Sequence, residues 1–150
     1  MGEPMSGDGN GGPAAAPGKI GIVTGMEMEL AALGSWRDDA RVATALSATD
    51  PDRAEAEAER LAAEGCRFLL SWGIAGGLDP ALEAGTVFSA VEVLAEDGPA
   101  ELLYSPAGHF AALYGSNHPV TTVAEKADLF AETGAIAGNG RVAVGHRHQH

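Results

Sequence analysis

Short apolar runs of β-branched residues alternate with helix-forming stretches along this 150-residue chain, and no other feature constrains its fold as strongly. Strands are predicted at 19–24, 41–46, 67–72, 86–94 and 101–104, and a last strand is predicted to begin at 135–137. Helices are predicted at 26–33, 51–64 and 122–133. Strand, helix and strand in turn are typical of an α/β fold with a mostly parallel sheet. Such sheets bind ligands at the carboxyl ends of their strands.

Single residues mark where the predicted helices begin and end. Asp50 or Thr49 can cap the second helix, and Pro51 suits its first turn. The pattern Thr122-x-x-Glu125 is a capping box that opens the third helix, and Gly134 is a typical helix stop. The apolar positions of the second helix are mostly alanine, so we expect this helix to lie on the surface.

The two ends of the chain differ in pattern from its middle. Residues 1–18 are rich in Gly and Pro without periodicity, which predicts a disordered leader. Residues 138–150 continue neither the strand nor the helix pattern and are predicted to form a divergent tail. The tail ends in alternating histidines, which we expect to be part of it rather than a metal site: His146, His148 and His150. The folded domain is thus predicted at 19–137, and we expect that the coding frame or the domain is broken near residue 138.

Composition and charge exclude several classes of protein. The formal net charge of −12 argues against binding nucleic acid or anionic membranes, which require clustered Lys and Arg. The single cysteine, Cys66, excludes an internal disulfide and a multi-cysteine zinc site. No stretch approaches the ~18 apolar residues of a membrane span, and no secretory signal is visible. With 45% hydrophobic residues to build a core, we expect a soluble cytoplasmic protein without a metal or cofactor.

Two segments follow predicted strands at the ligand-binding edge, namely 24–29 and 73–77. In the first, Glu29 can act as a general base towards water, or it can be a solvated residue of the first helical turn. In the second, the backbone N–H groups of a glycine-rich loop can hold a phosphate, a carboxylate or a ribose hydroxyl, or the glycines can simply allow a tight turn. The loop matches neither the Walker pattern nor GxGxxG, so nothing favours ATP or NAD.

The remaining charged residues give weaker signals. Residues 68–125 contain no Lys or Arg, so a bound phosphate would need backbone donors and a cation such as Arg37 or Arg41. His109 and His118 fall in loop-like segments without a visible partner, and we expect ordinary surface histidines. Four acidic residues have spacing unlike a calcium loop and are expected to form a solvated face: Glu92, Glu96, Asp97 and Glu101.

Taken together, the two candidate segments are similar in order and spacing to a known enzyme superfamily. KIGIVTGMEMEL (19–30) resembles the opening strand and helix of the nucleoside phosphorylases and nucleosidases, above all the methylthioadenosine/adenosylhomocysteine nucleosidases. SWGIAGGLDPALEAGTVFSAVEV (71–93) resembles the central glycine-loop segment of that superfamily. ATDPDRAEAEAERLAAEG (48–65) and GSNHPVTTVAEKADLFAETGAIA (115–137) are similar to the bacterial hopanoid-associated phosphorylases.

The resemblance implies a three-layer α/β/α sandwich with a mostly parallel mixed sheet, incomplete at its C-terminal end. It implies cleavage of a purine N-glycosidic bond through an oxocarbenium-like ribosyl cation, which positioning and charge can stabilise. The implied substrate is adenosylhopane, a lipid-linked nucleoside of hopanoid biosynthesis, with adenine as a product. Water and phosphate both remain open as the nucleophile, with phosphate as the only co-substrate. Homo-oligomers are common in the superfamily.

Particular residues take roles from the same resemblance. Glu29 matches the acid that activates the attacking water, and Met26 would line the ribose pocket. The glycine loop would hold the ribose or the phosphate through Ile74, Ala75, Gly76 and Gly77. Gly25 and Gly76 are the expected phosphate ligands, and Ser116 is a further expected substrate contact.

The chain departs from the superfamily at two places. Ile74 stands where the nucleosidases have a hydroxyl residue. Gly138, Asn139, Gly140 and Arg141 stand where the superfamily has Val-Asp/Glu-Met-Glu, and an arginine cannot accept hydrogen bonds from ribose hydroxyls. The later aspartate that assists the leaving base has no counterpart within the 150 residues. We therefore expect an N-terminal two-thirds of such an enzyme, inactive on its own. The alternatives are a nucleoside- or adenine-binding module without catalysis and a non-functional product.

Overall fold

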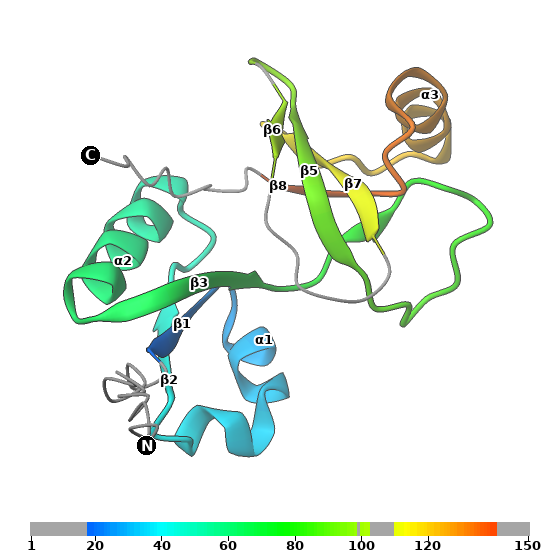
Figure 1. Ribbon diagram of the computed structural model, residues 1–150. Helices are drawn as coiled ribbons and strands as arrows, with labels where there is room; N and C mark the ends of the chain where they lie inside the picture. The colour runs from blue at the N-terminus through cyan, green and yellow to red at the C-terminus, as the bar shows by residue number, and fades with distance from the viewer. Residues whose placement is uncertain (1–17, 99, 103–109, 141–150) are drawn as a thin grey trace, which may run out of the picture.

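Three parallel strands form the first sheet of the computed structural model, which describes residues 18–98, 100–102 and 110–140 (Figure 1). The strands are β1 (Lys19–Thr24), β2 (Val42–Leu46) and β3 (Cys66–Trp72), in the spatial order β2-β1-β3. Their registers pair Thr24 with both Leu46 and Trp72, so all three strands end at the same edge. The predicted leader up to residue 17, His109 and the C-terminal histidines lie outside the described residues.

Helix α2 (Pro51–Ala63) covers one face of this sheet (Figure 1). Asp50 is the residue that caps it, because its carboxylate accepts the backbone N–H groups of residues 52 and 53 at 2.9 and 3.3 Å. Leu61 anchors the helix among Ala45 and Cys66, while most of its other side chains stay exposed or half-buried, as its alanine-rich pattern predicts. A Cβ at Gly21 would lie 3.1 Å from the Leu61 side chain, so the glycine permits the close approach.

The opposite face of the sheet is only partly covered. Helix α1 (Glu27–Ala32) and the short 3-10 helix η1 (Gly34–Asp38) flank it (Figure 1). Between them and the strands lies a groove of about 830 Å³ with mostly apolar walls, lined among others by Ile20, Ile22, Leu33, Trp36, Phe68, Leu70 and Trp72. Phe68 and Leu70 remain 57% and 47% exposed, so this sheet face is apolar and open.

A second sheet contains five strands in the order β4-β8-β7-β5-β6. Their bounds are β4 (Gly76–Gly77), β5 (Ser89–Ala95), β6 (Glu101–Leu102), β7 (Phe110–Ser116) and β8 (Ala137–Gly140). The three inner strands are parallel, and the two short edge strands are antiparallel to their neighbours. Helix α3 (Val123–Thr133) packs beside this sheet through Leu129 and Phe130, against a core that contains Tyr114 and Leu78.

The α/β class with mostly parallel strands is confirmed, but several details differ from the sequence-based expectation, among them the unexpected η1 and β4 and a start of β5 at Ser89 rather than at 86. The strands form two sheets rather than one. β7 was not predicted, because its sequence FAALYGS is rich in Ala and Gly and lacks β-branched residues. The last strand covers Ala137–Gly140, so the first residues assigned to the divergent tail lie in the sheet between β7 and β4.

Gly134 closes α3 in the left-handed conformation, with φ at 69°. A side chain at this position is strained, so Gly134→Ala is expected to lower the free energy of unfolding by about 1 kcal/mol. Asparagine tolerates this conformation better, so Gly134→Asn serves as the matched variant with a smaller expected loss. Urea unfolding measures both, and equal losses in the two variants would contradict the conformational explanation.

Candidate functional site

Glu29 is a buried carboxylate directly beyond the carboxyl end of β1, with only 5% of its surface exposed. Its Oε2 accepts the backbone N–H groups of Gly25 and Met26 at 2.9 and 3.0 Å. Its Oε1 accepts the N–H of Ile74 at 2.8 Å. One carboxylate therefore joins the loop after β1 to the glycine loop after β3, which excludes the interpretation of Glu29 as a solvated helix residue.

The local sequence explains how these groups meet. Glu29 is the third residue of α1, so its side chain reaches back to the N–H of Met26, the residue that precedes the helix. The parallel pairing of Thr24 with Trp72 places the ends of β1 and β3 side by side, which brings Ile74 within reach. The Trp72 Nε1–H also donates to the backbone carbonyl of Glu29 at 3.1 Å and ties α1 to β3.

Gly73 is required by the close approach of Glu29 to the glycine loop. A Cβ at position 73 would lie 2.8 Å from Oε1 and 3.2 Å from Cδ of Glu29. Separations below 3.0 Å are essentially never seen for real Cβ atoms, so no side chain fits there unless Glu29 or the loop moves.

The hydrogen bonds to Glu29 leave a defined chemical capacity. An ionised carboxylate offers about four acceptor positions, two on each oxygen. The three backbone N–H groups fill both positions of Oε2 and one of Oε1. Within the described residues no further donor to Glu29 is seen, so the remaining position on Oε1 can accept one hydrogen bond from a water molecule or from a ligand hydroxyl.

The other candidate residues lie at different distances from this carboxylate. Met26 and Ile74 are next to it and are 38% and 55% exposed. Gly76 and Gly77 form β4 and pair with Gly138 and Ala137 of β8. Because the N–H groups of Gly25 and Ile74 are bonded to Glu29, neither is free for a phosphate or ribose unless the carboxylate releases it.

Ser116 lies two strands away from the glycine loop. Gly76 and the β7 residue Tyr114 both pair with Gly138, which places them about 10 Å apart across β8. Ser116 is 3% exposed. Its hydroxyl stabilises the local turn, because it donates to the His118 carbonyl at 2.6 Å and accepts the His118 N–H at 3.2 Å. Its role as a substrate contact remains a prediction.

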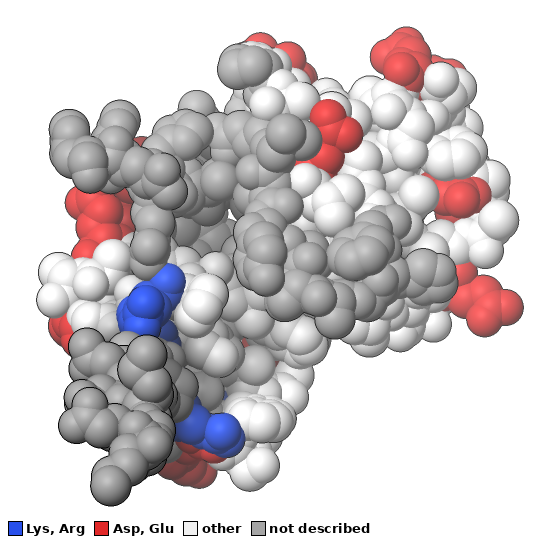
Figure 2. All heavy atoms as spheres, in the orientation of Figure 1, with Lys and Arg blue, Asp and Glu red and all other residues white. Residues whose placement is uncertain are grey.

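Arg41, one of the two suggested partners for a phosphate, is bound to an acid instead. Its Nε and Nη2 donate to the Asp39 carboxylate at 3.0 and 2.8 Å, and its guanidinium lies over the Trp36 ring. These hydrogen bonds lower the pKa of Asp39 to about 2. The Lys and Arg side chains visible in Figure 2 gather over the first sheet, whereas the charged side chains visible around α3 are acidic.

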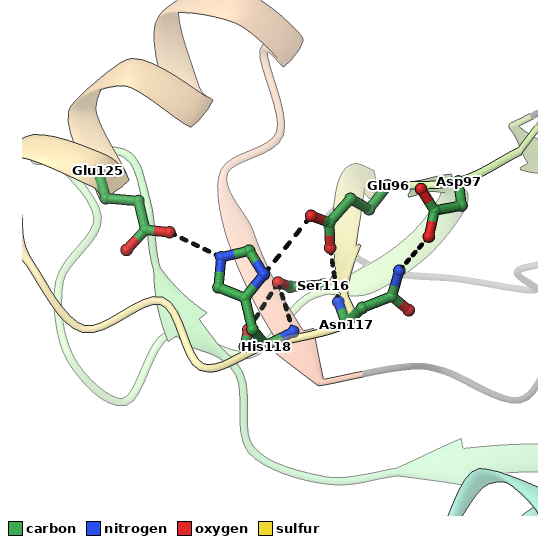
Figure 3. Close-up of polar contacts among 6 residues, drawn as sticks. All are labelled: Glu96, Asp97, Ser116, Asn117, His118 and Glu125. Atoms are coloured by element: carbon green, nitrogen blue, oxygen red, sulfur yellow. Dashed lines mark hydrogen bonds and ion pairs between the residues drawn. The ribbon is translucent and has the colours of Figure 1, made fainter.

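His118 is the centre of a polar cluster that the sequence did not reveal (Figure 3). Its Nε2 lies 2.9 Å from Glu125 Oε1, and its Nδ1 lies 3.5 Å from Glu96 Oε1. The neighbouring Asn117 donates its N–H to Glu96 at 2.7 Å and its side-chain amide to Asp97. The expectation of a histidine without a partner is therefore wrong, and Glu96 and Asp97 do more than form a solvated face. Sequence offers no signal here, because Glu96 and Asp97 are about 20 residues away along the chain.

The carboxylates around His118 predict a dependence of stability on pH. The hydrogen bond to Glu125, together with the charge of Glu96, raises the pKa of His118 above its usual value. A raised folded-state pKa stabilises the fold fully below about pH 6.5, and that contribution disappears as the pH rises through the folded-state value. The urea midpoint should fall over this range in the wild-type chain and fall less in His118→Gln. Parallel pH profiles for the two proteins would contradict the prediction.

Comparison with solved structures finds proteins of the same fold, whereas no protein-family model and no curated protein matches the chain. Campylobacter jejuni 5'-methylthioadenosine/S-adenosyl homocysteine nucleosidase superposes with a TM-score of 0.65 at 18% identity, covering 84% of this chain and 76% of that one. The Helicobacter pylori nucleosidase D198N mutant with 5'-methylthioadenosine in its active site gives 0.67 at 15% identity, with 84% and 76% covered. A Helicobacter pylori futalosine hydrolase mutant gives 0.65 at 16% identity, with 83% and 80% covered.

This chain has the nucleosidase fold. These matches confirm the expected resemblance in fold to the phosphorylase and nucleosidase superfamily. At 15–18% sequence identity they show the fold alone. Within 18–98, 100–102 and 110–140, no helix is long and apolar enough to cross a membrane. The same part of the nucleosidase-fold chain contains no group of three or more His, Cys, Asp or Glu side chains that could hold a metal ion.

Proposed function

We propose that this nucleosidase-fold protein binds an adenosine-type nucleoside and cleaves its N-glycosidic bond, releasing adenine. The expectation that the chain is inactive on its own rests on residues 138–141, whereas the arrangement around Glu29 supports activity. The observation that carries the proposal is the Glu29 carboxylate, which joins two loops at the ligand-binding edge and keeps one acceptor position open. The solved neighbours with this fold act on nucleosides by their names, and one holds 5'-methylthioadenosine. The proposed partner is therefore a small nucleoside, bound by a soluble protein that can form homo-oligomers.

The proposed reaction needs only the chain, the nucleoside and water. The C1′–N9 bond breaks, its electron pair goes to the adenine ring, and the ribosyl group becomes cationic. Glu29 holds a water molecule through Oε1 and accepts its proton as the oxygen bonds to C1′, which gives the free sugar. The base that leaves with the electron pair takes up a proton from solvent water to become adenine, and Glu29 returns its proton to the solvent. A fixed, buried carboxylate stabilises the positive charge that develops on the ribosyl group.

Hydrolysis is favoured over phosphorolysis by the distribution of cations. Residues 68–125 contain no Lys or Arg, and Arg41 is paired with Asp39. A phosphate would have to rely on Arg37 of the short helix η1 or on backbone N–H groups, among which the Gly76 N–H is the proposed donor. Within the adenosine class, adenosylhopane is the specific substrate that we propose, on the resemblance of 48–65 and 115–137 to the hopanoid-associated phosphorylases.

An adenine-release assay on the full chain tests the proposal. Purified protein is incubated with adenosine, 5'-methylthioadenosine and adenosylhopane, with and without phosphate, and the products are separated by chromatography. Adenine together with the free sugar is expected. A ribose 1-phosphate product would replace hydrolysis by phosphorolysis, and no adenine from any substrate would refute the catalytic proposal.

A second candidate function is nucleoside binding without turnover. One observation favours it: β8 ends at Gly140, which offers no side chain where the resemblance implies a methionine that packs on the base or the sugar. Calorimetry with adenine separates the two candidates, because a binding module gives heat of binding but no adenine release. Absence of both signals would refute both candidates.

A further inference from the structure

The turn after β2 has an unusual backbone beside the Glu29 site. Ala48 and Thr49 adopt positive φ angles of 53° and 59° in succession. This left-handed region is uncommon for residues other than glycine and is an outlier for a β-branched residue such as Thr49. Strain of this kind persists only where surrounding contacts impose it.

The contacts that impose this backbone lead directly to Gly25. The Thr49 N–H donates to the Gly25 carbonyl at 3.0 Å, and Ser47, two residues earlier, donates its N–H to the Thr24 carbonyl at 2.8 Å. A Cβ built at Gly25 would lie 3.4 Å from Glu29 Oε2 and 3.4 Å from the Thr49 methyl carbon Cγ2, so the carboxylate and the methyl group border the same space beside the Gly25 Cα. The Thr49 methyl group therefore limits the movement of Gly25 towards the turn, while the Thr49 N–H fixes its carbonyl.

We propose that Thr49 is a positioning residue of the Glu29 site, which acts by holding Gly25 so that its N–H is directed at Glu29 Oε2. The proposal rests on the proposed function in so far as Glu29 is the group that activates water. Thr49 touches neither Glu29 nor, in this account, the substrate. Its strained backbone is maintained because the relaxed turn would release Gly25 and with it one of the two bonds that fix Oε2.

The strain gives the proposal a signature that a purely structural residue lacks. Thr49→Gly removes both the methyl group that borders the space beside Gly25 and the unfavourable φ, so the melting temperature should stay the same or rise while Gly25 becomes freer to move away from Glu29. Ala48→Gly is the matched control, since it relieves the same kind of strain one residue earlier and leaves the Thr49 contact with Gly25 in place. Thr49→Val keeps a methyl group against Gly25 and is expected to behave like the wild-type chain.

Two readouts on the full chain test the proposal. The first is hydrogen exchange of the three amides that donate to Glu29, those of Gly25, Met26 and Ile74, followed by NMR. We expect exchange at Gly25 and Met26 to become about tenfold faster in Thr49→Gly and to stay unchanged in Ala48→Gly and Thr49→Val. The second is adenine release, for which kcat is expected to fall about 10- to 100-fold in Thr49→Gly with little change in KM.

The outcomes separate this proposal from the proposed function. If Thr49→Gly leaves the three amides unchanged, or changes them only together with a lowered melting temperature, the positioning role is wrong. If the amides respond as expected but even the wild-type chain releases no adenine, the positioning role stands and the catalytic proposal fails. If the amides respond and kcat does not, Thr49 does not position Glu29 for catalysis.

Discussion

Glu29→Ala is expected to destabilise the fold by about 3 kcal/mol and to abolish adenine release. The substitution leaves the N–H groups of Gly25, Met26 and Ile74 without their acceptor. The site is buried, since only 5% of the Glu29 surface is exposed. Buried donors without a partner are unfavourable by about 1–3 kcal/mol each, although their effects do not add fully. Urea unfolding and the adenine assay measure the two effects.

Glu27→Ala is the matched control for this variant. Glu27 is also an acidic residue in the first turn of α1, but it is exposed. Its removal is expected to change stability by no more than about 0.5 kcal/mol and to leave adenine release unchanged. Similar losses in the two variants would show that helix α1, rather than the Glu29 carboxylate, is responsible.

Gly73→Ala is expected to have the second largest effect, because the new methyl group would lie 2.8 Å from Glu29 Oε1. Either the carboxylate or the glycine loop must move, which should lower the free energy of unfolding by about 1–3 kcal/mol. A displacement near 1 Å at the reacting group can lower the rate about 100-fold. Stability is measured by urea unfolding, and the rate by adenine release.

Gly115→Ala is the matched control, because it tests the effect of replacing a glycine by alanine at a position with enough space for the side chain. A Cβ at Gly115 meets its nearest atom at 3.6 Å, which is ordinary van der Waals contact. We expect a change in stability within about 0.5 kcal/mol for this variant. A Gly73→Ala protein as stable and as active as Gly115→Ala would show that the space beside Glu29 is not needed.

The parts of the fold that sequence predicts are those with local signals. β1, α1, β2, α2 and β3 match their predicted ranges within two residues, because β-branched runs, Asp50 and Pro51 mark them directly. The two segments that flank Glu29 were also predicted as the ligand-binding edge, and the structure brings Glu29, Met26 and Ile74 together there. The loop contact itself follows from the parallel order of β1 and β3.

The features that sequence does not predict depend on contacts between distant residues. β7 is a central strand whose Ala and Gly content gives no strand signal, so its neighbours β5 and β8 determine its conformation. The sequence pattern predicts that Glu125 forms a capping box with Thr122 at the start of α3. The structure shows Thr122 accepting the Glu125 N–H, while the Glu125 carboxylate turns to His118. The positive φ angles of Ala48 and Thr49 could not be predicted either, because neither residue is a glycine.

In the proposed function, Glu29 joins the loops after β1 and β3 into one nucleoside site. We would test this by an NMR titration of the ¹⁵N-labelled full chain with 5'-methylthioadenosine. The amide signals of Gly25, Met26, Ile74 and Gly76 are expected to shift together with one dissociation constant, and Glu29→Gln is expected to weaken or remove this response. Shifts confined to the cluster around His118, or the same response in Glu29→Gln, would contradict it.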